Sequence, residues 1–194
     1  MERSKIAFIS FLLVLLVGVA ACRKHYTPKP KGYPRIDLPT HAYSSYHSDC
    51  SFRFDLPVYA TIAHDSSRLA EPCWLNIDYP SLRARIHLSY KDVHHDLGKL
   101  MEDSRNFVYS HVSKADAIDE TLLSYPKHKV YGILYDLSGN AASSLQFVVT
   151  DSTRHFLRGA LYFNMEPNYD SLTPAIVFIR ADMMRLIESL EWSN

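Results

Sequence analysis

The chain has 194 residues, with 21 Lys and Arg against 21 Asp and Glu, and 47% of its residues are hydrophobic. This length suits one domain with a sizeable core, and the apolar content with near-zero net charge excludes an intrinsically disordered protein. The charge balance also argues against a protein that coats nucleic acid, because such domains are usually strongly basic.

Residues 1–21 predict a lipoprotein signal peptide rather than a part of the fold. Arg3 and Lys5 give a basic start, an apolar run interrupted only by Ser10 follows over 6–17, and small residues lead to Cys22. This order is typical of a secretory signal. The apolar run is too short for a membrane-spanning helix, which needs roughly 20 apolar residues.

The signal ends in Val-Ala-Ala-Cys, which resembles the lipobox of bacterial lipoproteins and puts Cys22 at the lipidated position. The resemblance implies that the thiol receives a diacylglyceryl group and that Cys22 becomes the new N-terminus. Acyl chains such as palmitate would then anchor the protein, since each buried methylene contributes about 0.8 kcal/mol. The alternative is an ordinary signal peptidase site at which Cys22 has no role.

Residues 22–49 predict a proline-rich basic tether. The prolines are Pro28, Pro30, Pro34 and Pro39, and the basic residues before the first acid are Arg23, Lys24, Lys29, Lys31 and Arg35. Prolines at this density favour polyproline II and prevent a helix. A spacer is therefore the favoured interpretation, over a segment that binds a groove or anionic headgroups. Residues 50–194 remain as a single, mildly acidic domain.

Cys50 and Cys73 predict a disulfide. A secreted chain folds in an oxidising compartment, and lipidation of Cys22 leaves an even number of cysteines. Two free buried thiols are the alternative. The sequence has no Cys-x-x-Cys, which disfavours a redox-active dithiol.

The domain alternates strand and helix patterns along the chain. Period-two alternation predicts strands near 52–56, 58–63, 73–79, 83–91, 117–124, 129–137, 144–150 and 155–163. A helix opens at 92–95, and a second spans 174–191, with Thr173 as its cap and Pro174 in its first turn. This order predicts an α+β fold, an antiparallel sheet of about six to seven strands with helices packed on it.

The strand over 83–91 carries a candidate binding face. Its apolar side faces a core, and its other side presents Arg83, Arg85, His87 and Lys91. Asn76 and Asp78 would lie on a neighbouring strand. A cationic sheet face could hold an acidic partner or an anionic ligand. The alternatives are a solvated face balanced by acids elsewhere and a face covered by the terminal helix.

Catalytic and metal-binding motifs are missing from the sequence. It has no G-x-G-x-x-G, no G-x-x-x-x-G-K-[ST], no H-E-x-x-H and no G-x-S-x-G. The run over 94–96 is interpreted as a helix start, and the run over 151–155 as a hairpin turn. We therefore expect no catalytic residue, no metal, no cofactor and no small-molecule substrate.

Several long runs closely resemble the gliding motility lipoprotein GldD family. They include YTPKPKGYPRIDLP at 26–39, PCW at 72–74, IHLSYK at 86–91, EDSR at 102–105, KADAI at 114–118, KVYG at 129–132, GNAASS at 139–144, DST at 151–153 and HFLRGALYF at 155–163. Together with Cys22, these runs extend the likeness over nearly all of the mature chain. The order of strands and helices is also similar to PsbP/Mog1-like domains.

The resemblance implies a lipid-anchored protein needed for gliding and for the associated type IX secretion system, whose partners are envelope proteins of that machinery. Lipoproteins of such bacteria that go to the outside usually carry acids just after the lipidated cysteine. Here Arg23-Lys24-His25 follows, which predicts a protein that faces the periplasm and leaves the choice of membrane open. Two rivals are a small periplasmic hydrolase using Asp103, Ser152 or His155, and a lipoprotein that binds an envelope polymer.

Overall fold

The computed structural model of the protein describes residues 36–166 and 168–193. The fold is α+β, as the sequence predicts. In chain order its elements are β1 (Tyr43–His47), β2 (Phe52–Pro57), β3 (Thr61–His64), β4 (Leu75–Tyr79), the 3-10 turn η1 (Pro80–Leu82), β5 (Ala84–Asp92), α2 (Leu97–Tyr109), β6 (Ala115–Tyr125), η2 (Pro126–His128), β7 (Val130–Gly139), β8 (Ser143–Thr150), β9 (His155–Phe163), α3 (Tyr169–Glu188) and β10 (Glu191–Trp192).

The strands form two antiparallel sheets. The larger has seven strands in the order β3-β4-β5-β9-β8-β7-β6, and the smaller has three in the order β1-β2-β10. In the larger sheet β5 pairs with its sequence neighbour β4 on one side and with the distant strand β9 on the other. Between β5 and β9 the chain forms α2 and then β6, β7 and β8, which make up the far end of the same sheet. This crossover puts two distant segments at the centre of the sheet.

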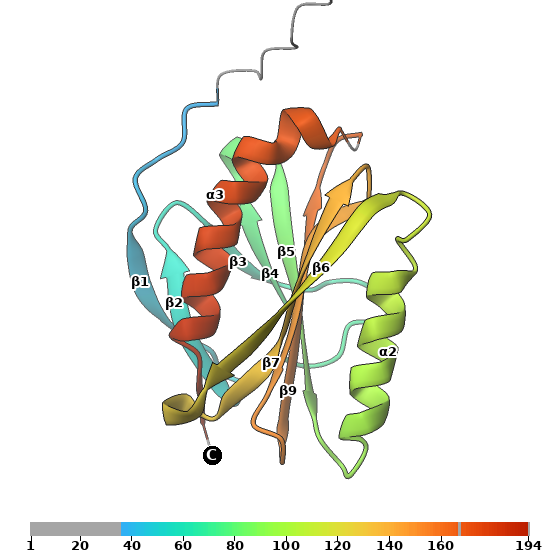
Figure 1. Ribbon diagram of the computed structural model, residues 1–194. Helices are drawn as coiled ribbons and strands as arrows, with labels where there is room; N and C mark the ends of the chain where they lie inside the picture. Colours follow the sequence, from blue (N-terminus) through green and yellow to red (C-terminus); the bar gives the residue numbers. More distant parts are fainter. Residues whose placement is uncertain (1–35, 167, 194) are drawn as a thin grey trace, which may run out of the picture. The chain divides into compact units, whose positions relative to one another are not determined.

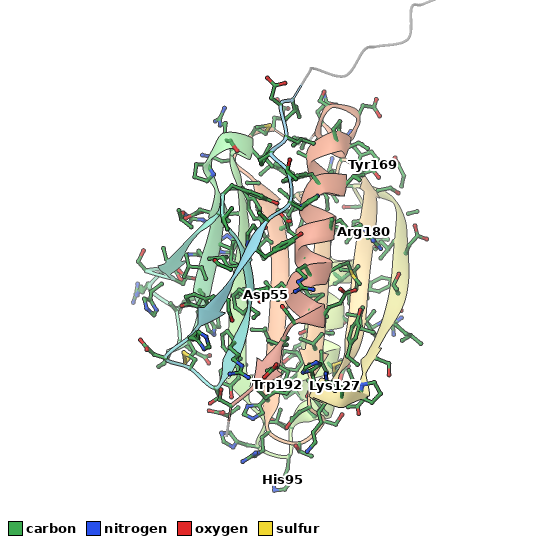
Figure 2. The ribbon with its side chains drawn as sticks, turned by 90° about the vertical axis from the view of Figure 1, so that its left-hand side faces the viewer. Asp55, His95, Lys127, Tyr169, Arg180 and Trp192 are labelled. Atoms are coloured by element: carbon green, nitrogen blue, oxygen red, sulfur yellow. A yellow bond between two sulfur atoms is a disulfide. The ribbon has the colours of Figure 1, made fainter. Side chains whose placement is uncertain are left out.

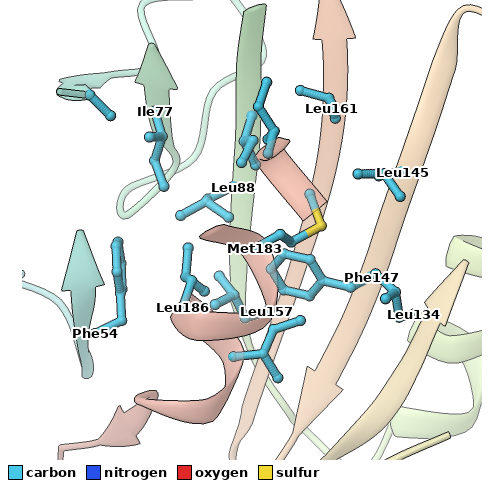
Figure 3. Close-up of a cluster of buried hydrophobic side chains, with 14 of the residues drawn as sticks. Phe54, Ile77, Leu88, Leu134, Leu145, Phe147, Leu157, Leu161, Met183 and Leu186 are labelled. Atoms are coloured by element: carbon cyan, nitrogen blue, oxygen red, sulfur yellow. The ribbon is translucent and has the colours of Figure 1, made fainter. Parts of the chain in front are cut away.

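One face of the large sheet is covered by α3 and by β2 of the small sheet, and the main core lies between them. The alternation in β5 puts Ile86 and Leu88 on this face. Figure 3 shows side chains from α3, from β2 and from several strands of the large sheet meeting there. Burial of apolar area is the main stabilising term in such a core.

The opposite face of the large sheet is only partly covered. Figure 1 shows α2 on the other side of the sheet from α3. α2 packs through Val108 onto Tyr135, Val148 and Phe156 of β7, β8 and β9, which form a second, smaller core. Among the described residues, no helix packs on the part of this face over β3, β4 and β5.

Two ion pairs fasten α3 on either side. The Arg180 guanidinium binds both carboxylate oxygens of Asp136 on β7, at 2.9 and 3.2 Å. Arg185 binds Asp55 on β2 at 2.6 Å. Figure 2 shows Asp55 and Arg180 on opposite flanks of the helix. Within 36–166 and 168–193, no helix is long and apolar enough to cross a membrane.

Two boundaries differ from the sequence-based expectation. β1 lies inside the segment expected to be tether, because Tyr43 to His47 pair with β2. α3 begins at Tyr169 and not at Pro174, since the Asn168 side chain accepts the Ser171 N–H and caps the helix there. Pro174 lies in the second turn, and Thr173 donates its hydroxyl to the Tyr169 carbonyl.

The structure contains the predicted disulfide between Cys50 and Cys73, whose Cα atoms lie 5.8 Å apart. Cys50 precedes β2 and Cys73 precedes β4, so the bond joins the small sheet to the large one. Both residues pack against the main core.

We expect the Cys50→Ala/Cys73→Ala double variant to lose roughly 3 kcal/mol of unfolding free energy. The disulfide closes a loop of sequence separation 23, and a loop of this size restricts the unfolded chain by about that amount. Urea denaturation without reductant measures the difference. With dithiothreitol present, the wild-type protein should fall to the stability of the variant; an unchanged midpoint under reduction would contradict the prediction.

Candidate functional site

The uncovered part of the sheet is floored by alternate residues of β5 and β9. On β5 these are Arg85, His87, Ser89 and Lys91, which oppose Tyr162, Ala160, Arg158 and Phe156 of β9 in that order. β4 extends the floor, with Asp78 opposite Arg85 and Asn76 opposite His87. The core-facing alternation of the same strands fixes this outward row, since successive side chains point to opposite faces.

A cavity of about 600 Å³ lies between this floor and α2, and we name it the α2 cavity. α2 lines it with Leu100, Asp103, Ser104 and Phe107, and the opposite side is lined by Asp65 and Trp74. Phe107 leaves 57% of its surface exposed, although it is aromatic. A cavity of this size that combines apolar side chains with polar groups is a candidate binding site.

A second cavity of about 480 Å³, the edge cavity, adjoins the first, because His87 and Tyr162 line both. It extends past Asp78 and Arg85 to Arg83 at the end of the strands. The rings of His87 and Tyr162 meet edge to face, 5.6 Å between centroids. Burial and then the charge of Arg85 lower the pKa of His87, so its imidazole is neutral near pH 7.

Three of the four residues of the predicted binding face share one side of the sheet, which is less cationic than expected. Arg85, His87 and Lys91 lie on it, whereas Arg83 ends the η1 turn in a left-handed conformation ahead of the strand. Arg85 forms a two-point ion pair with Asp78, at 2.5 and 3.0 Å. Lys91 binds Glu71 at 2.5 Å and lies over the Trp74 ring. Two of the expected charges are therefore neutralised by neighbours.

Arg158 supplies the charge that the sequence analysis missed. It lies on β9 opposite Ser89 and lines the α2 cavity. Its Nη2 donates to Gln146 Oε1 at 2.5 Å, and its guanidinium lies 5.1 Å from the centre of the Phe107 ring. The sequence contains a pattern that could have indicated this residue. Within 155–163, Arg158 is the charged residue between apolar neighbours on the side of the strand that faces away from the core.

We expect the Arg158→Gln substitution to raise the pKa values of His87 and His111. Burial is the main cause that lowers both, and the charge of Arg158 lowers them further. NMR titration of the imidazole protons measures the change. Arg105→Gln on the outer side of α2 is the matched control, which should leave the pKa of His87 where it is. A pKa of His87 that does not respond to Arg158→Gln would contradict the prediction.

The three residues of the rival hydrolase do not form one site. Asp103 lines the α2 cavity, but Ser152 lies in the β8–β9 turn. His155 is 5% exposed, bonds the Tyr90 hydroxyl at 2.7 Å and stacks on Trp192. Asp151 organises the turn: burial opposes its ionisation, but backbone N–H groups of His155, Arg154 and Thr153 hold its pKa well below the usual range. The run over 151–155 is thus a hairpin turn, as interpreted.

Metal ligands do not cluster in the described ranges. Within 36–166 and 168–193, no group of three or more His, Cys, Asp or Glu side chains could hold a metal ion. His94 and Asp96 bond locally, the Asp96 carboxylate accepting the His94 N–H ahead of α2. The chemistry of the two cavities therefore consists of aromatic, hydroxyl, amide and charged groups.

Comparison with known families decides the relationship. The sequence model of the family described as gliding motility lipoprotein GldD matches residues 23–192. The chain belongs to the GldD family. The match includes both cavities and every strand and helix named above. Members of this family are lipoproteins of gliding motility, so the protein is a membrane-anchored component of that process.

Other comparisons are more distant. No curated protein matches the sequence. Among solved structures, the chain is similar to the solution structure of cyanobacterial PsbP (CyanoP) from Synechocystis sp. PCC 6803, with 9% sequence identity and a TM-score of 0.48. The likeness covers 84% of this chain and 99% of that chain.

Cys22, the predicted lipidation site, lies outside the described residues.

Proposed function

We propose that this GldD-family chain is a periplasmic lipoprotein that binds other envelope proteins of the gliding machinery and of the associated type IX secretion system, without catalysing a reaction. The observation that carries the proposal is the asymmetry of the large sheet. One face is covered by α3 and β2, whereas the other leaves the α2 cavity and the edge cavity open side by side. An open, partly apolar face of this kind favours a partner.

The layout of the chain supports this role. Residues 1–21 would be removed as a signal peptide, Cys22 would carry the lipid, and residues 22–49 would lead from the lipid to the domain over 50–194, with β1 docked onto it. The basic residues after Cys22 favour retention at the periplasmic side. A domain held near a membrane meets envelope partners at a raised effective concentration, so even modest affinity suffices.

The anchor has its own test. We expect Cys22→Ser to abolish lipidation and to yield a soluble or uncleaved protein, because no thiol remains to receive the diacylglyceryl group. Membrane fractionation and the mass of the mature N-terminus measure this. Membrane association unchanged from wild type would contradict lipidation at Cys22.

Site-specific photo-crosslinking in intact cells tests the binding role. A photoreactive residue at Ser89, on the floor of the α2 cavity, should capture a component of the gliding or secretion apparatus. The matched control carries the same photoreactive residue at Val177. This position is 62% exposed on the outer side of α3, the helix that covers the other face of the large sheet. Recovery of no such component from Ser89, or equal recovery from Val177, would defeat the proposal.

A further inference from the structure

Arg158 is a partly buried cation with no carboxylate partner among the described residues. Other arginines of the described residues bind carboxylates: Arg53 binds Glu191, Arg85 binds Asp78, Arg180 binds Asp136 and Arg185 binds Asp55. In the described part of the chain, no Asp or Glu lies within ion-pair distance of Arg158. Burial lowers the pKa of Arg158, and the Tyr162 phenol offsets only part of that effect. Removing a charge from water without pairing it is costly. A ligand that supplied an anion would recover that cost.

Two buried N–H donors at this point of the α2 cavity lack an acceptor in the described part of the chain. Arg158 Nε and Gln146 Nε2 are both buried, and neither finds an acceptor within the described residues. The one acceptor that Gln146 offers is already used by Arg158 Nη2. His87 lines the same cavity as a neutral ring. The missing group is therefore an acceptor, and a negatively charged one forms the stronger hydrogen bond with a guanidinium.

The rest of the α2 cavity limits the charge of the ligand. Asp65 and Asp103 also line it, and they would repel a multiply charged anion such as a phosphate ester. A single carboxylate avoids most of that repulsion and fits the planar fork of a guanidinium. Trp74, Leu100 and Phe107 line the cavity beside Arg158, so the carboxylate should come with an apolar neighbour.

We propose that the α2 cavity binds an acidic side chain of a partner protein, its carboxylate on Arg158 and a flanking apolar side chain between Trp74 and Phe107. This inference rests on the proposed function, since it names the chemistry by which the partner is recognised. Phe107 suits the apolar contact because its ring is largely exposed and already holds the Arg158 guanidinium against one face. The charged group would give specificity and the aromatic groups contact area.

The test uses the full-length lipoprotein in detergent, labelled with ¹⁵N-tryptophan. Its two indoles report separately: Trp74 lines the cavity, whereas Trp192 bonds the Lys129 carbonyl away from it. The probes are acetylated, amidated peptides Ala-Phe-X-Phe-Ala with X as Glu, Gln or Lys. We expect the Glu peptide to shift the Trp74 indole signal alone. The Gln peptide, which differs only in charge, should bind roughly tenfold more weakly or worse.

Two variants locate the carboxylate. Arg158→Gln should abolish the preference for Glu over Gln, and the matched control Arg105→Gln should keep it. Ser89→Glu places a carboxylate opposite Arg158, so it should block the Glu peptide while the Trp192 signal stays in its native position. This second variant separates loss of the site from loss of the fold, because an internal partner for Arg158 is expected to stabilise the protein.

Several results would overturn the inference. They are equal binding of the Glu and Gln peptides, preference for the Lys peptide, no shift with any peptide, and a Glu preference that survives Arg158→Gln. A shift of Trp74 by chitotriose but not by the peptides would favour an envelope polymer instead. Crosslinking from Ser89 is independent of these outcomes: a captured motility component with no carboxylate preference would leave the proposed function standing and reject only the inference.

Discussion

Replacing Asp182 by alanine is expected to lower the free energy of unfolding by about 3 kcal/mol. Asp182 lies on α3 with 1% of its surface exposed, and its carboxylate is bonded from three sides. Tyr59 donates to both oxygens at 2.8 and 2.9 Å, Tyr43 donates at 2.9 Å, and His41 Nδ1 lies at 2.8 Å. Burial and then the hydrogen bond to Asp182 raise the pKa of Tyr43 to about 12, so its phenol is a donor at neutral pH.

The loss of stability in Asp182→Ala should be concentrated at residues 41–43, where the chain enters the domain. His41 stacks on Phe178 of α3, with ring centroids 4.3 Å apart, and Arg185 lies over the Tyr43 ring. The Asp182 cluster thus ties residues 41–43, just ahead of and into β1, to the long helix. If a lipid tether pulls on the domain, the load reaches this cluster before it reaches the large sheet.

Urea denaturation measures the stability, and hydrogen exchange over 43–47 measures the local effect. Asp170→Ala is the matched control, because Asp170 is an exposed acid in the first turn of the same helix, where an acid contributes less than about 1 kcal/mol. Asp182→Asn keeps the shape of the side chain and one acceptor, so its loss of unfolding free energy should lie between those of Asp182→Ala and Asp170→Ala. A cost for Asp182→Ala no larger than for Asp170→Ala would show that the cluster does not hold β1.

The sequence predicts the fold class well because the central strands carry apolar residues at every second position, most regularly in β5. β5, β8 and β9 are found within a residue or two of their true ends, since each has one face in the main core. β1 was missed because most of its side chains are exposed and only its partner β2 makes it a strand. Local patterning carries no information about a partner of that kind.

Local sequence pattern places some residues of the candidate site but not others. The alternation of β5 correctly placed Arg85, His87 and Lys91 on one side of the sheet. The sequence also places Asp78, the counter-ion of Arg85, on a neighbouring strand. The counter-ion of Lys91 could not be foreseen, because Glu71 lies in a loop and pairs with Lys91 only through the tertiary fold. Arg158 reaches the same surface through the β5–β9 pairing, between strands that are not sequence neighbours. The Asp182 cluster joins residues 123 to 141 positions apart, for which no local pattern exists.

Replacing Gly132 by alanine is expected to cost at least about 3 kcal/mol, because a side chain at this position has no room. Gly132 lies on β7 opposite Val149 of β8. A Cβ there would lie 1.8 Å from the Val148 carbonyl oxygen and within 3 Å of two more backbone atoms of β8. Backbone atoms in a paired strand cannot rotate away, so β7 and β8 would have to separate.

Two other glycines make this prediction specific. Gly159→Ala would meet the Phe147 ring at 2.1 Å, but a ring can shift, so its cost should be smaller. Gly98→Ala, in α2 with nothing within 4 Å, should stabilise the protein by roughly 0.5–1 kcal/mol through helix propensity. Urea denaturation of the three variants should therefore rank them Gly98, Gly159, Gly132 from most to least stable. Equal stabilities for Gly132→Ala and Gly98→Ala would refute the close approach of the two strands.

The Gly132 variant also connects the sheet to the proposed site. Tyr135 and Val148, on the strands that would separate, are part of the floor on which α2 packs. A shift of α2 would move Leu100 and Phe107 relative to Arg158 and change the α2 cavity. Gly132→Ala should therefore weaken binding of the Glu peptide under conditions in which the variant is still folded, whereas Gly98→Ala should leave binding intact. Normal peptide binding by folded Gly132→Ala would mean that the cavity does not depend on how β7 and β8 seat α2.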